Sequence, residues 1–276
     1  MIINGKKIAD KILKDLEIKR KKIKKPIKLG VILAGNHPVS LHYIKYKQKI
    51  CKKLGVRFQL KQYPEQVSSN KLCQEIQIYQ KQAKPTGLII QLPLPRNLNT
   101  QRILNRVEYG RDVDCLSEKR MVKIFLNRNP EILPPTVAAI LEIFKEYKIN
   151  IKNQQITLIG YGTLVGRPLS AVLLNQGASL LVVQKSCKDL KAFTEKSDIV
   201  ICATGQKNLL QKNMIKKGAI VLDAGASEDS SEKEKICGDV NFTAVQKKTR
   251  LITPVPGGIG PITLAMLMKN LFELMK

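Results

Sequence analysis

The order of apolar runs along this chain constrains its fold more than any other feature. In the first half, runs typical of strands alternate with helical patterns: strands at 27–35, 57–63 and 86–95, and helices at 37–55 and 69–82. Gly55 can cap the first helix, while Pro93 and Pro95 end the third strand. This alternation predicts a mostly parallel α/β sheet, because parallel strands need a crossover between them.

A second series of the same kind begins at Gln155. Its predicted elements are strands at 155–162, 178–183, 198–204 and 218–225 and helices at 164–176, 188–196 and 211–216. Such a compact series is typical of a nucleotide-binding domain. Between the series, 131–149 carries two prolines and then a helix that can bridge two domains. We therefore expect a two-domain α/β protein with domains at 1–133 and 134–261, and an apolar C-terminal helix at 262–276 that packs back on the first domain.

Composition excludes several classes of protein. No apolar run approaches the roughly 18 residues that a membrane span needs, and the N-terminus lacks a signal-peptide core, so we expect a cytoplasmic protein. Six cysteines form no C-x-x-C pair, which argues against a zinc site or a disulfide framework. The two histidines, His37 and His42, flank one helix start, where a solvated surface role is typical. We expect no bound metal.

The formal net charge of +26 has two interpretations. It favours nucleic acid or anionic small molecules as ligands. It also fits a biased composition, since lysines are spread over the whole chain with few aromatic residues among them. No RNP-type or zinc-finger pattern is present, so we expect no dedicated nucleic-acid binding. A basic RNA-binding protein stays as an alternative, which steeply salt-dependent RNA affinity would identify.

The segment ITLIGYGTLVGRP, residues 156–168, carries three glycines between a strand and a helix. Gly160, Gly162 and Gly166 form G-x-G-x-x-x-G, one residue longer than the usual dinucleotide fingerprint. Early glycines permit a tight turn and close phosphate approach, with the helix N-terminus facing the anion. The strand–turn–helix context therefore predicts dinucleotide binding, with an ordinary glycine turn as the alternative.

The next strand bears on which cofactor binds. NAD sites place an acidic residue near its end, but this chain has Gln184, Lys185 and Ser186 there. A cation and a hydroxyl suit the 2′-phosphate of NADP, so NADP is favoured and NAD is kept as an alternative. Lys185 is equally typical of a surface lysine in so basic a chain.

Four polar residues of the first domain are candidates for chemistry. Tyr43 and Lys47 are four residues apart on a predicted helix and share a face, although about one such pair is expected by chance. A partly desolvated lysine has a lowered pKa and can transfer protons. Gln91 ends an apolar strand, where open α/β sheets bind ligands. Asp114 can accept hydrogen bonds from a ligand, but a capping or solvated carboxylate is equally typical.

The stretch ITPVPGGIGPIT, residues 252–263, alternates proline with glycine. Proline fixes φ and glycine reaches conformations closed to other residues. The stretch therefore predicts a stiff loop with few side chains.

Together these segments resemble one family nearly end to end, the bifunctional methylenetetrahydrofolate dehydrogenase/methenyltetrahydrofolate cyclohydrolases. NHPVSLHYIKYK resembles the family's substrate segment with its Tyr-x-x-x-Lys, GLIIQLPLP the strand that carries its glutamine, and RDVDC its Asp-Val-Asp segment. ITPVPGGIGPIT resembles its C-terminal signature almost residue for residue.

The resemblance implies reversible NADP-linked oxidation of 5,10-methylene- to 5,10-methenyltetrahydrofolate and hydrolysis to 10-formyltetrahydrofolate. Folate would bind in a cleft between the catalytic domain at 1–133 and a Rossmann-like NADP domain at 134–261. Lys47 would be the acid/base of hydrolysis, with Gln91 helping to set it. Tyr43 would pack on the aminobenzoyl ring, Asp114 would grip the pterin, and the Pro/Gly loop would form one wall of the site.

The full set of expected site residues has three parts. The catalytic residues are Lys47, Tyr43, Gln91 and Asp114. The substrate-binding residues are Tyr43, Lys47, Ile90, Gln91, Leu92, Asp114, Pro256, Gly257, Gly258, Gly260, Pro261 and Thr263. The cofactor-binding residues are Gly160, Tyr161, Gly162, Gly166, Arg167, Lys185, Ser186 and Ala226. A homodimer is expected by resemblance, and the positive charge makes polyglutamylated folates plausible substrates.

The chain departs from the family pattern at four places. Cys115-Leu116-Ser117 stands where Gly-Phe-His is usual, and Pro134-Pro135-Thr136-Val137-Ala138-Ala139 replaces Pro-Cys-Thr-Pro-x-Gly. Gly162 replaces a frequent serine, and Gln184-Lys185 replaces a common His-Ser or His-Arg. These changes bear on cofactor preference and pterin fit. A dehydrogenase-only member and a shikimate-dehydrogenase-like oxidoreductase are the nearest alternatives, and formation of 10-formyltetrahydrofolate distinguishes them.

Overall fold

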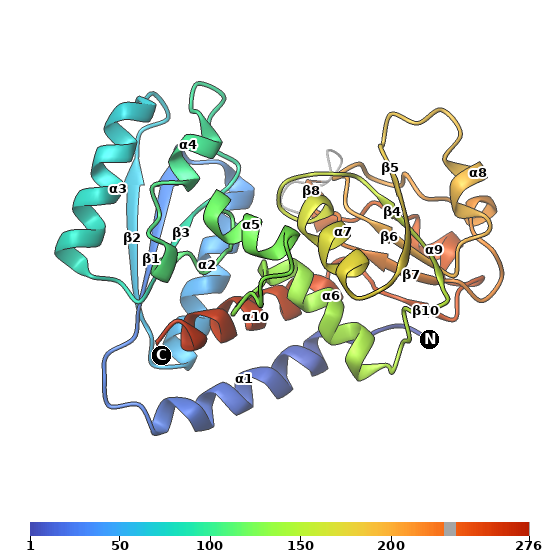
Figure 1. Cartoon of the computed structure of the whole chain (residues 1–276), viewed down its shortest axis with the longest axis horizontal. Helices are drawn as coiled ribbons and strands as arrows, with labels where there is room; N and C mark the ends of the chain where they lie inside the picture. The colour runs from blue at the N-terminus through green and yellow to red at the C-terminus, as the bar shows by residue number, and fades with distance from the viewer. Residues whose placement is uncertain (229–235, 276) are drawn as a thin grey trace. The chain divides into compact units, whose positions relative to one another are not determined.

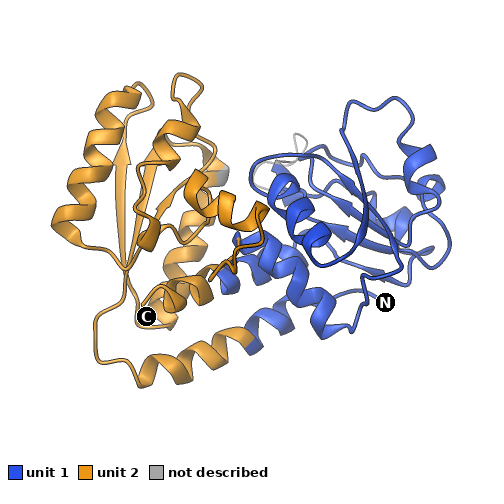
Figure 2. Cartoon of the chain, in the orientation of Figure 1, with its two compact units in different colours: residues 1–11, 134–266 blue, residues 12–133, 267–276 orange. Residues whose placement is uncertain are grey.

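The computed structural model describes residues 1–228 and 236–275, and the chain divides into two compact units (Figure 2). Unit 1 comprises Met1–Lys11 and Pro134–Met266, and unit 2 comprises Ile12–Leu133 and Leu267–Lys276. Two helices, α1 (Gly5–Lys21) and α10 (Ile259–Glu273), have residues in both units.

Unit 2 is built on a three-stranded parallel sheet in the order β2-β1-β3 (Figure 1). Its strands are β1 (Lys28–Ala34), β2 (Arg57–Tyr63) and β3 (Gly87–Ile90), and its crossover helices are α2 (Pro38–Lys53) and α3 (Ser69–Ala83). Ser68 caps α3 by accepting a hydrogen bond from the Lys71 backbone N–H. Leu29 in the central strand pairs with Phe58 and Gly87. The strands and helices predicted for this half are present, but the strand expected at 86–95 ends at Ile90, because Pro93 and Pro95 lack the backbone N–H that strand pairing needs.

Shorter elements of unit 2 were not predicted. They are α4 (Thr100–Leu104), the 3₁₀ helix η1 (Tyr109–Arg111) and α5 (Glu118–Phe125). Each is too short to show helical periodicity, and local side-chain caps such as Asn99 on the Arg102 backbone N–H help to hold them. The part of α10 from Leu267 onward belongs to this unit, where Asn270 donates hydrogen bonds to the carbonyls of Val113 and Leu133, whereas Ile259–Met266 belongs to unit 1.

Unit 1 contains a five-stranded parallel sheet in the order β10-β7-β6-β4-β5. The strands are β4 (Gln155–Ile159), β5 (Ser179–Val183), β6 (Ile199–Cys202), β7 (Ile220–Asp223) and β10 (Leu251–Ile252). The unit also contains the helices α6 (Pro135–Glu146), α7 (Gly166–Asn175), α8 (Leu190–Thr194) and α9 (Phe242–Val245) and the 3₁₀ helix η2 (Lys212–Met214). A small hairpin is formed by β8 (Ser227–Glu228) and β9 (Ile236–Cys237). The strand order reverses at β4, which lies between β5 and β6 and makes its carboxyl end the expected ligand-binding position.

Three boundaries in unit 1 differ from the predictions. The helix expected at 211–216 is only the 3₁₀ turn η2, and the helix expected at 188–196 is limited to α8. The final helix begins at Ile259, three residues earlier than predicted, because proline at 261 lies in its first turn, where no backbone donor is needed. The short strands β8, β9 and β10 and the helix α9 were not predicted. The N-terminus lies beside β10, where Ile3 donates its backbone N–H to the carbonyl of Ile252.

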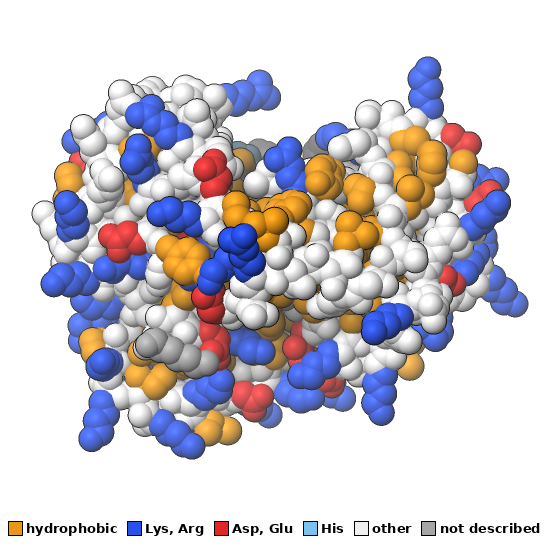
Figure 3. All heavy atoms as spheres, in the orientation of Figure 1, with side chains coloured by type: hydrophobic (Ala, Val, Ile, Leu, Met, Phe, Trp, Pro, Cys, Tyr) orange, Lys and Arg blue, Asp and Glu red, His pale blue; other side chains and the backbone are white. Residues whose placement is uncertain are grey.

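The positive charge is spread over the surface that Figure 3 draws. Lys and Arg side chains occur across this face with Asp and Glu among them, not gathered into one patch. No helix within 1–228 or 236–275 is both long and apolar enough to cross a membrane.

Candidate active site

Helix α2 carries a polar residue in the middle of its buried face. Ser40, Ile44, Lys47 and Cys51 recur at helical spacing and are all buried. The Lys47 side chain therefore cannot remain in water, although every other lysine of this helix is exposed. A lysine placed in an apolar stripe needs a buried partner, because burial of an unpaired charge is very costly.

That partner is Gln91, which follows β3 directly. The Lys47 Nζ donates a hydrogen bond of 2.8 Å to the Gln91 Oε1. Gln91 is itself held at both ends, since its backbone N–H donates to the carbonyl of Ile32 and its Nε2 donates to the carbonyl of Leu92 at 2.7 Å. The amide is therefore oriented with its oxygen toward the ammonium group. This contact joins two residues that are 44 positions apart in the chain.

Asp114 lies close enough to interact electrostatically with Lys47. Burial lowers the pKa of Lys47, whereas the charges of Asp114 and Cys51 raise it. Burial raises the pKa of Asp114 to about 6, while the positive charge of Lys47 lowers it and Asp112 raises it. The site thus holds an amine that releases its proton more readily than usual and a carboxyl that keeps its proton more readily.

The loop that presents Asp114 is organised by Asp112, which sequence reasoning did not single out. Asp112 is buried, and its carboxylate accepts hydrogen bonds from the backbone N–H groups of Leu116 and Ser117. Cys115, which lies between Asp112 and Leu116 in the sequence, is fully buried and adopts a φ of 57°, a left-handed conformation that favours glycine. This explains physically why the family usually has glycine at this position. The repeated Asp in RDVDC was the signal that could have identified Asp112.

The remaining expected residues of unit 2 surround this contact. Tyr43 lies one turn before Lys47 on α2 and is half-buried, and burial raises the pKa of its hydroxyl. Ile90 is buried at the end of β3, and Leu92 follows Gln91 with a cis peptide to Pro93. The carbonyl of Leu92 also accepts a hydrogen bond from the Ser40 hydroxyl at 3.4 Å.

In unit 1, the three glycines at the end of β4 have different structural roles. Gly160 has a φ of 99°, and a Cβ there would lie 2.4 Å from the carbonyl oxygen of Ala203. A Cβ on Gly166, the first residue of α7, would lie 2.2 Å from the oxygen of Gly160. Only Gly162 faces open space, with nothing within 4 Å of a Cβ. The turn therefore fits a dinucleotide: two glycines let backbone pack tightly and the third leaves room for phosphate at the helix N-terminus.

The other expected cofactor residues lie on exposed segments at the same edge of the sheet. Arg167 in the first turn of α7 is exposed, and its guanidinium carbon lies 5.7 Å from the centre of the Tyr161 ring. Lys185 and Ser186 follow β5 and are exposed, and Ala226 is exposed three residues after β7. All of these side chains are thus open to a ligand at the carboxyl ends of the strands.

The Pro/Gly loop is packed mainly against its own unit. Gly257 has a φ of 104°, after a cis peptide between Val255 and Pro256. A Cβ on Gly258 would lie 2.4 Å from the oxygen of Pro254, and one on Gly5 would lie 1.7 Å from the oxygen of Gly258. A Cβ on Gly260, in contrast, would meet nothing within 4 Å.

The last two members of this group belong to the first turns of α10. Pro261 and Thr263 are half-buried, and the Thr263 hydroxyl donates to the carbonyl of Ile259. The space beside Gly260 is therefore open to a ligand, whereas the space beside Gly258 is filled by Pro254 and Thr253.

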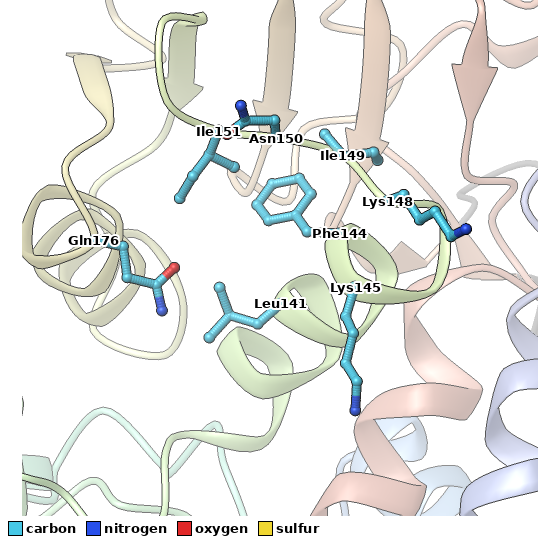
Figure 4. A pocket seen from close by; sticks show the side chains of 8 residues that line it. All are labelled: Leu141, Phe144, Lys145, Lys148, Ile149, Asn150, Ile151 and Gln176. Carbon is cyan, nitrogen blue, oxygen red and sulfur yellow. The ribbon is translucent and has the colours of Figure 1, made fainter.

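One cavity lies apart from all these residues. It has a volume of about 440 Å³ and is lined by α6, the segment that follows it and Gln176 at the end of α7 (Figure 4). Figure 4 shows Leu141, Phe144 and Ile151 around the hollow and Lys145 and Lys148 pointing outward. Its lining segments precede the amino ends of β4 and β5, whereas open α/β sheets bind cofactors at the carboxyl ends. No predicted site residue lines it.

The predicted residues thus fall into three groups. The first group, in unit 2, contains Lys47, Gln91 and Asp114. Tyr43 lies one helical turn before Lys47, and Ile90 and Leu92 flank Gln91 in the sequence. The glycine turn and the Pro/Gly loop belong to unit 1. Within the described residues, no group of three or more His, Cys, Asp and Glu side chains is arranged to hold a metal ion.

Comparisons with known proteins identify the family of the chain. The sequence model described as the tetrahydrofolate dehydrogenase/cyclohydrolase catalytic domain matches residues 3–114, and the NAD(P)-binding domain of the same family matches 134–276. The bifunctional protein FolD of Nautilia profundicola is 38% identical over 274 residues, which cover 98% of this chain and 95% of the relative.

Solved structures give the same result. The bifunctional FolD methylenetetrahydrofolate dehydrogenase/cyclohydrolase of Campylobacter jejuni superposes with a TM-score of 0.93 at 34% identity, covering 100% of this chain and 98% of that one. The Trypanosoma brucei FolD enzyme, solved with NADP and an inhibitor, has a TM-score of 0.93 at 30% identity, with 99% and 96% covered. The resemblance found in the motifs is confirmed: this chain belongs to the tetrahydrofolate dehydrogenase/cyclohydrolase family.

Proposed function

We propose that this enzyme oxidises 5,10-methylenetetrahydrofolate with NADP and hydrolyses the methenyl product to 10-formyltetrahydrofolate, with Lys47 as the acid/base of hydrolysis. The observation that carries the proposal is the buried hydrogen bond of 2.8 Å between Lys47 and Gln91, beside Asp114. The family fixes the two reactions, and this contact indicates which residue moves protons. It also favours a bifunctional enzyme over the dehydrogenase-only alternative.

Hydrolysis needs proton transfers that oxidation does not. Water adds to the methenyl carbon and loses a proton, and a folate nitrogen must then gain one as its bond to that carbon breaks. An amine whose pKa is lowered by burial can release and take up such a proton more readily than an exposed lysine can. Gln91 keeps the amine in place because its own amide is held by the carbonyl of Leu92. Oxidation, in contrast, depends mainly on placement of the reacting carbon.

We assign the remaining unit 2 residues to folate recognition. Asp114, as a carboxylate, would accept hydrogen bonds from the amino groups of the pterin. Tyr43 would pack against the aminobenzoyl ring, since it lies half-buried one turn from Lys47. In unit 1, Gly260 of the Pro/Gly loop leaves open space in which a ligand can approach the backbone closely. The net charge of +26 favours folates with anionic polyglutamate tails.

We assign the turn after β4 to NADP. The cofactor, when bound, accepts the hydride from the one-carbon unit. Gly162 gives its phosphates access to the N-terminus of α7, and the exposed Arg167 adds a positive charge there. Lys185, exposed just beyond β5, is the residue that we assign to the 2′-phosphate, so that NADP is used in preference to NAD.

The test of the acid/base role is Lys47→Met, with Lys45→Met as its control. Both lysines belong to α2, but Lys45 is exposed. General acid/base catalysis contributes roughly 10²–10⁴-fold, so Lys47→Met is expected to lose at least about 100-fold in cyclohydrolase kcat while Lys45→Met stays within about twofold. Methenyltetrahydrofolate hydrolysis is followed by loss of its absorbance. A cyclohydrolase kcat of Lys47→Met equal to that of the wild type would contradict the assignment.

We also propose that the enzyme is a homodimer that associates through β5. This edge strand of the unit 1 sheet exposes Leu181 and Val182, with fractions of 37% and 36%, and Leu174 of α7 is 55% exposed. The edge strand β2 of the other sheet exposes mostly polar side chains instead. An apolar edge strand is unfavourable in water unless another chain covers it.

The dimer is tested by Leu181→Lys against Leu60→Lys, which changes a leucine of similar exposure on β2. Light scattering after size-exclusion chromatography should show a dimer for the wild type and for Leu60→Lys, and a monomer for Leu181→Lys. A wild-type monomer, or a dimer that survives Leu181→Lys, contradicts the proposed interface.

A further inference from the structure

Asp239 is a fully buried carboxylate that the proposed chemistry does not use. Its Oδ2 accepts hydrogen bonds from the backbone N–H of Thr204 at 2.6 Å and from the Thr204 hydroxyl at 2.9 Å. Its Oδ1 accepts one from the backbone N–H of Gln206 at 2.9 Å. These donors belong to the loop that follows β6, 33 to 35 residues away in the chain. A single side chain thus fixes the course of that loop.

Asp223, the last residue of β7, performs the same task on a second loop and on Asp239 itself. Its carboxylate accepts hydrogen bonds from the backbone N–H groups of Gly225, Asp239 and Val240, at 2.9, 3.1 and 2.9 Å. Its own backbone N–H donates to the Thr253 hydroxyl at 2.7 Å, at the start of the Pro/Gly loop. We call Asp223, Asp239, Thr204 and Thr253 the carboxylate network.

Two glycines give the carboxylates room. A Cβ on Gly225 would lie 2.1 Å from the Asp239 Oδ1, and a Cβ on Gly238 would lie 2.1 Å from the Asp223 Oδ2. Any other residue at either position would displace a carboxylate from its donors, since real Cβ atoms do not come so close. The carboxylate network is therefore a tightly packed unit.

The network ends at the loops assigned above to ligands. A Cβ on Gly160 would lie 2.4 Å from the oxygen of Ala203 and 3.1 Å from the Cγ2 of Thr204. Thr204, which is hydrogen-bonded to Asp239, therefore packs directly against the glycine turn. Gly225, which Asp223 holds, precedes the exposed Ala226. Thr253 begins the Pro/Gly loop, and a Cβ on Gly258 would lie 2.8 Å from its Cβ.

We propose that Asp239, through Thr204, is a positioning residue for NADP, and that Asp223 supports Asp239 by accepting a hydrogen bond from its backbone N–H. This inference rests on the proposed function and deepens it. None of the four residues needs to touch the cofactor. They act by holding backbone, which is the part of a dinucleotide site that must lie closest to the phosphates.

The test is Asp239→Asn, with Asp198→Asn as the matched control. An asparagine at 239 has the same size, but its Nδ2 is a donor, so either orientation leaves the N–H groups of Thr204 or of Gln206 facing a donor. Asp198 also accepts a backbone hydrogen bond, from Gln155, and pairs with Lys216, but it precedes β6 at the opposite end of that strand. Both variants therefore lose carboxylate hydrogen bonds within unit 1.

The expected result separates NADP binding from folding. Asp239→Asn should weaken NADP, measured by calorimetry as Kd and by dehydrogenase assay as KM, by at least about tenfold. Its cyclohydrolase kcat should stay within about threefold, because the residues assigned to hydrolysis belong to unit 2. Asp198→Asn should leave both NADP values within about twofold.

A second pair of variants decides the matter if Asp239→Asn does not fold. Thr204→Val removes the hydroxyl that Asp239 accepts from, whereas Thr204→Ser keeps it. We expect NADP Kd to rise at least about threefold in the valine variant alone. Unchanged NADP Kd in Thr204→Val, or an equal loss of both activities in Asp239→Asn, overturns the inference. Because the calorimetric Kd requires no turnover, this result is separate from whether wild type catalyses the two folate reactions.

Discussion

The hydrogen bond between Lys47 and Gln91 can be tested by two opposite changes at position 91. Gln91→Leu removes the acceptor and keeps the side chain at similar size, whereas Gln91→Glu keeps an acceptor and adds a negative charge. Both side chains are more than nine-tenths buried, so water cannot replace the lost acceptor freely. The two variants thus differ mainly in how they treat the charge on Lys47.

The magnitude follows from the geometry. A hydrogen bond to a charged group contributes about 1.5–3 kcal/mol. Each 1.36 kcal/mol in an activation barrier is a factor of ten in rate, so Gln91→Leu is expected to lower cyclohydrolase kcat by roughly 10- to 100-fold. The dehydrogenase should fall by no more than about threefold, because hydride transfer requires no proton at Lys47.

The two variants should shift the pKa of Lys47 in opposite directions, which the pH dependence of cyclohydrolase activity can show. Burial lowers the pKa of Lys47 in the wild type, loss of the acceptor lowers it further, and a carboxylate at position 91 raises it. The limb of the cyclohydrolase pH profile that Lys47 governs should therefore move to lower pH in Gln91→Leu and to higher pH in Gln91→Glu. Thermal unfolding of both variants controls for damage to the fold. Limbs that move in the same direction, or a wild-type kcat in Gln91→Leu, would refute the reasoning.

Four further predictions concern Lys185, Asp114 and Cys115. An exposed charge on the 2′-phosphate contributes about 1–1.5 kcal/mol, so Lys185→Ala should raise KM for NADP roughly five- to tenfold and leave KM for NAD unchanged, whereas a parallel rise for both cofactors contradicts its role. Burial raises the pKa of Asp114 to about 6, so KM for methylenetetrahydrofolate should increase as the pH falls below about 6, and Asp114→Asn should abolish this dependence. Because the pKa of Asp114 is higher in the folded than in the unfolded state, its contribution to the free energy of unfolding is full below the unfolded pKa and is lost as the pH rises through about 6. The free energy of unfolding of Asp114→Asn, measured in urea, should not show this decline. A left-handed conformation costs a non-glycine residue about 1–2 kcal/mol, so Cys115→Gly should be more stable than Cys115→Ala in urea unfolding, although alanine retains more of the buried side chain; the reverse order would show that the φ of 57° carries no strain.

The sequence by itself determined the architecture and the family. Alternating apolar runs and helical patterns are local properties, and they were sufficient to predict the strands of four or more residues and the main helices of both units. The Pro/Gly stretch and the Asp-Val-Asp segment were specific enough to identify the family. Local pattern failed where elements were very short, as at η2 and β10, because one or two turns or residue pairs leave no periodicity to detect.

Tertiary structure decided which side chains meet and why particular residues are required. Tyr43 and Lys47 could be placed on one helix face from their spacing, but the burial of that face and the partner of Lys47 depend on Gln91, 44 residues away. The sequence assigned no role to Asp239, because its donors at 204 and 206 are distant in the chain and ordinary in type. The structure also separates the glycines by role: Gly258 is required because a Cβ there would meet Pro254 and Thr253, whereas Gly162 and Gly260 face open space. Hydrogen-bond partners and close contacts are set by the packing of distant segments, and sequence spacing carries no record of it.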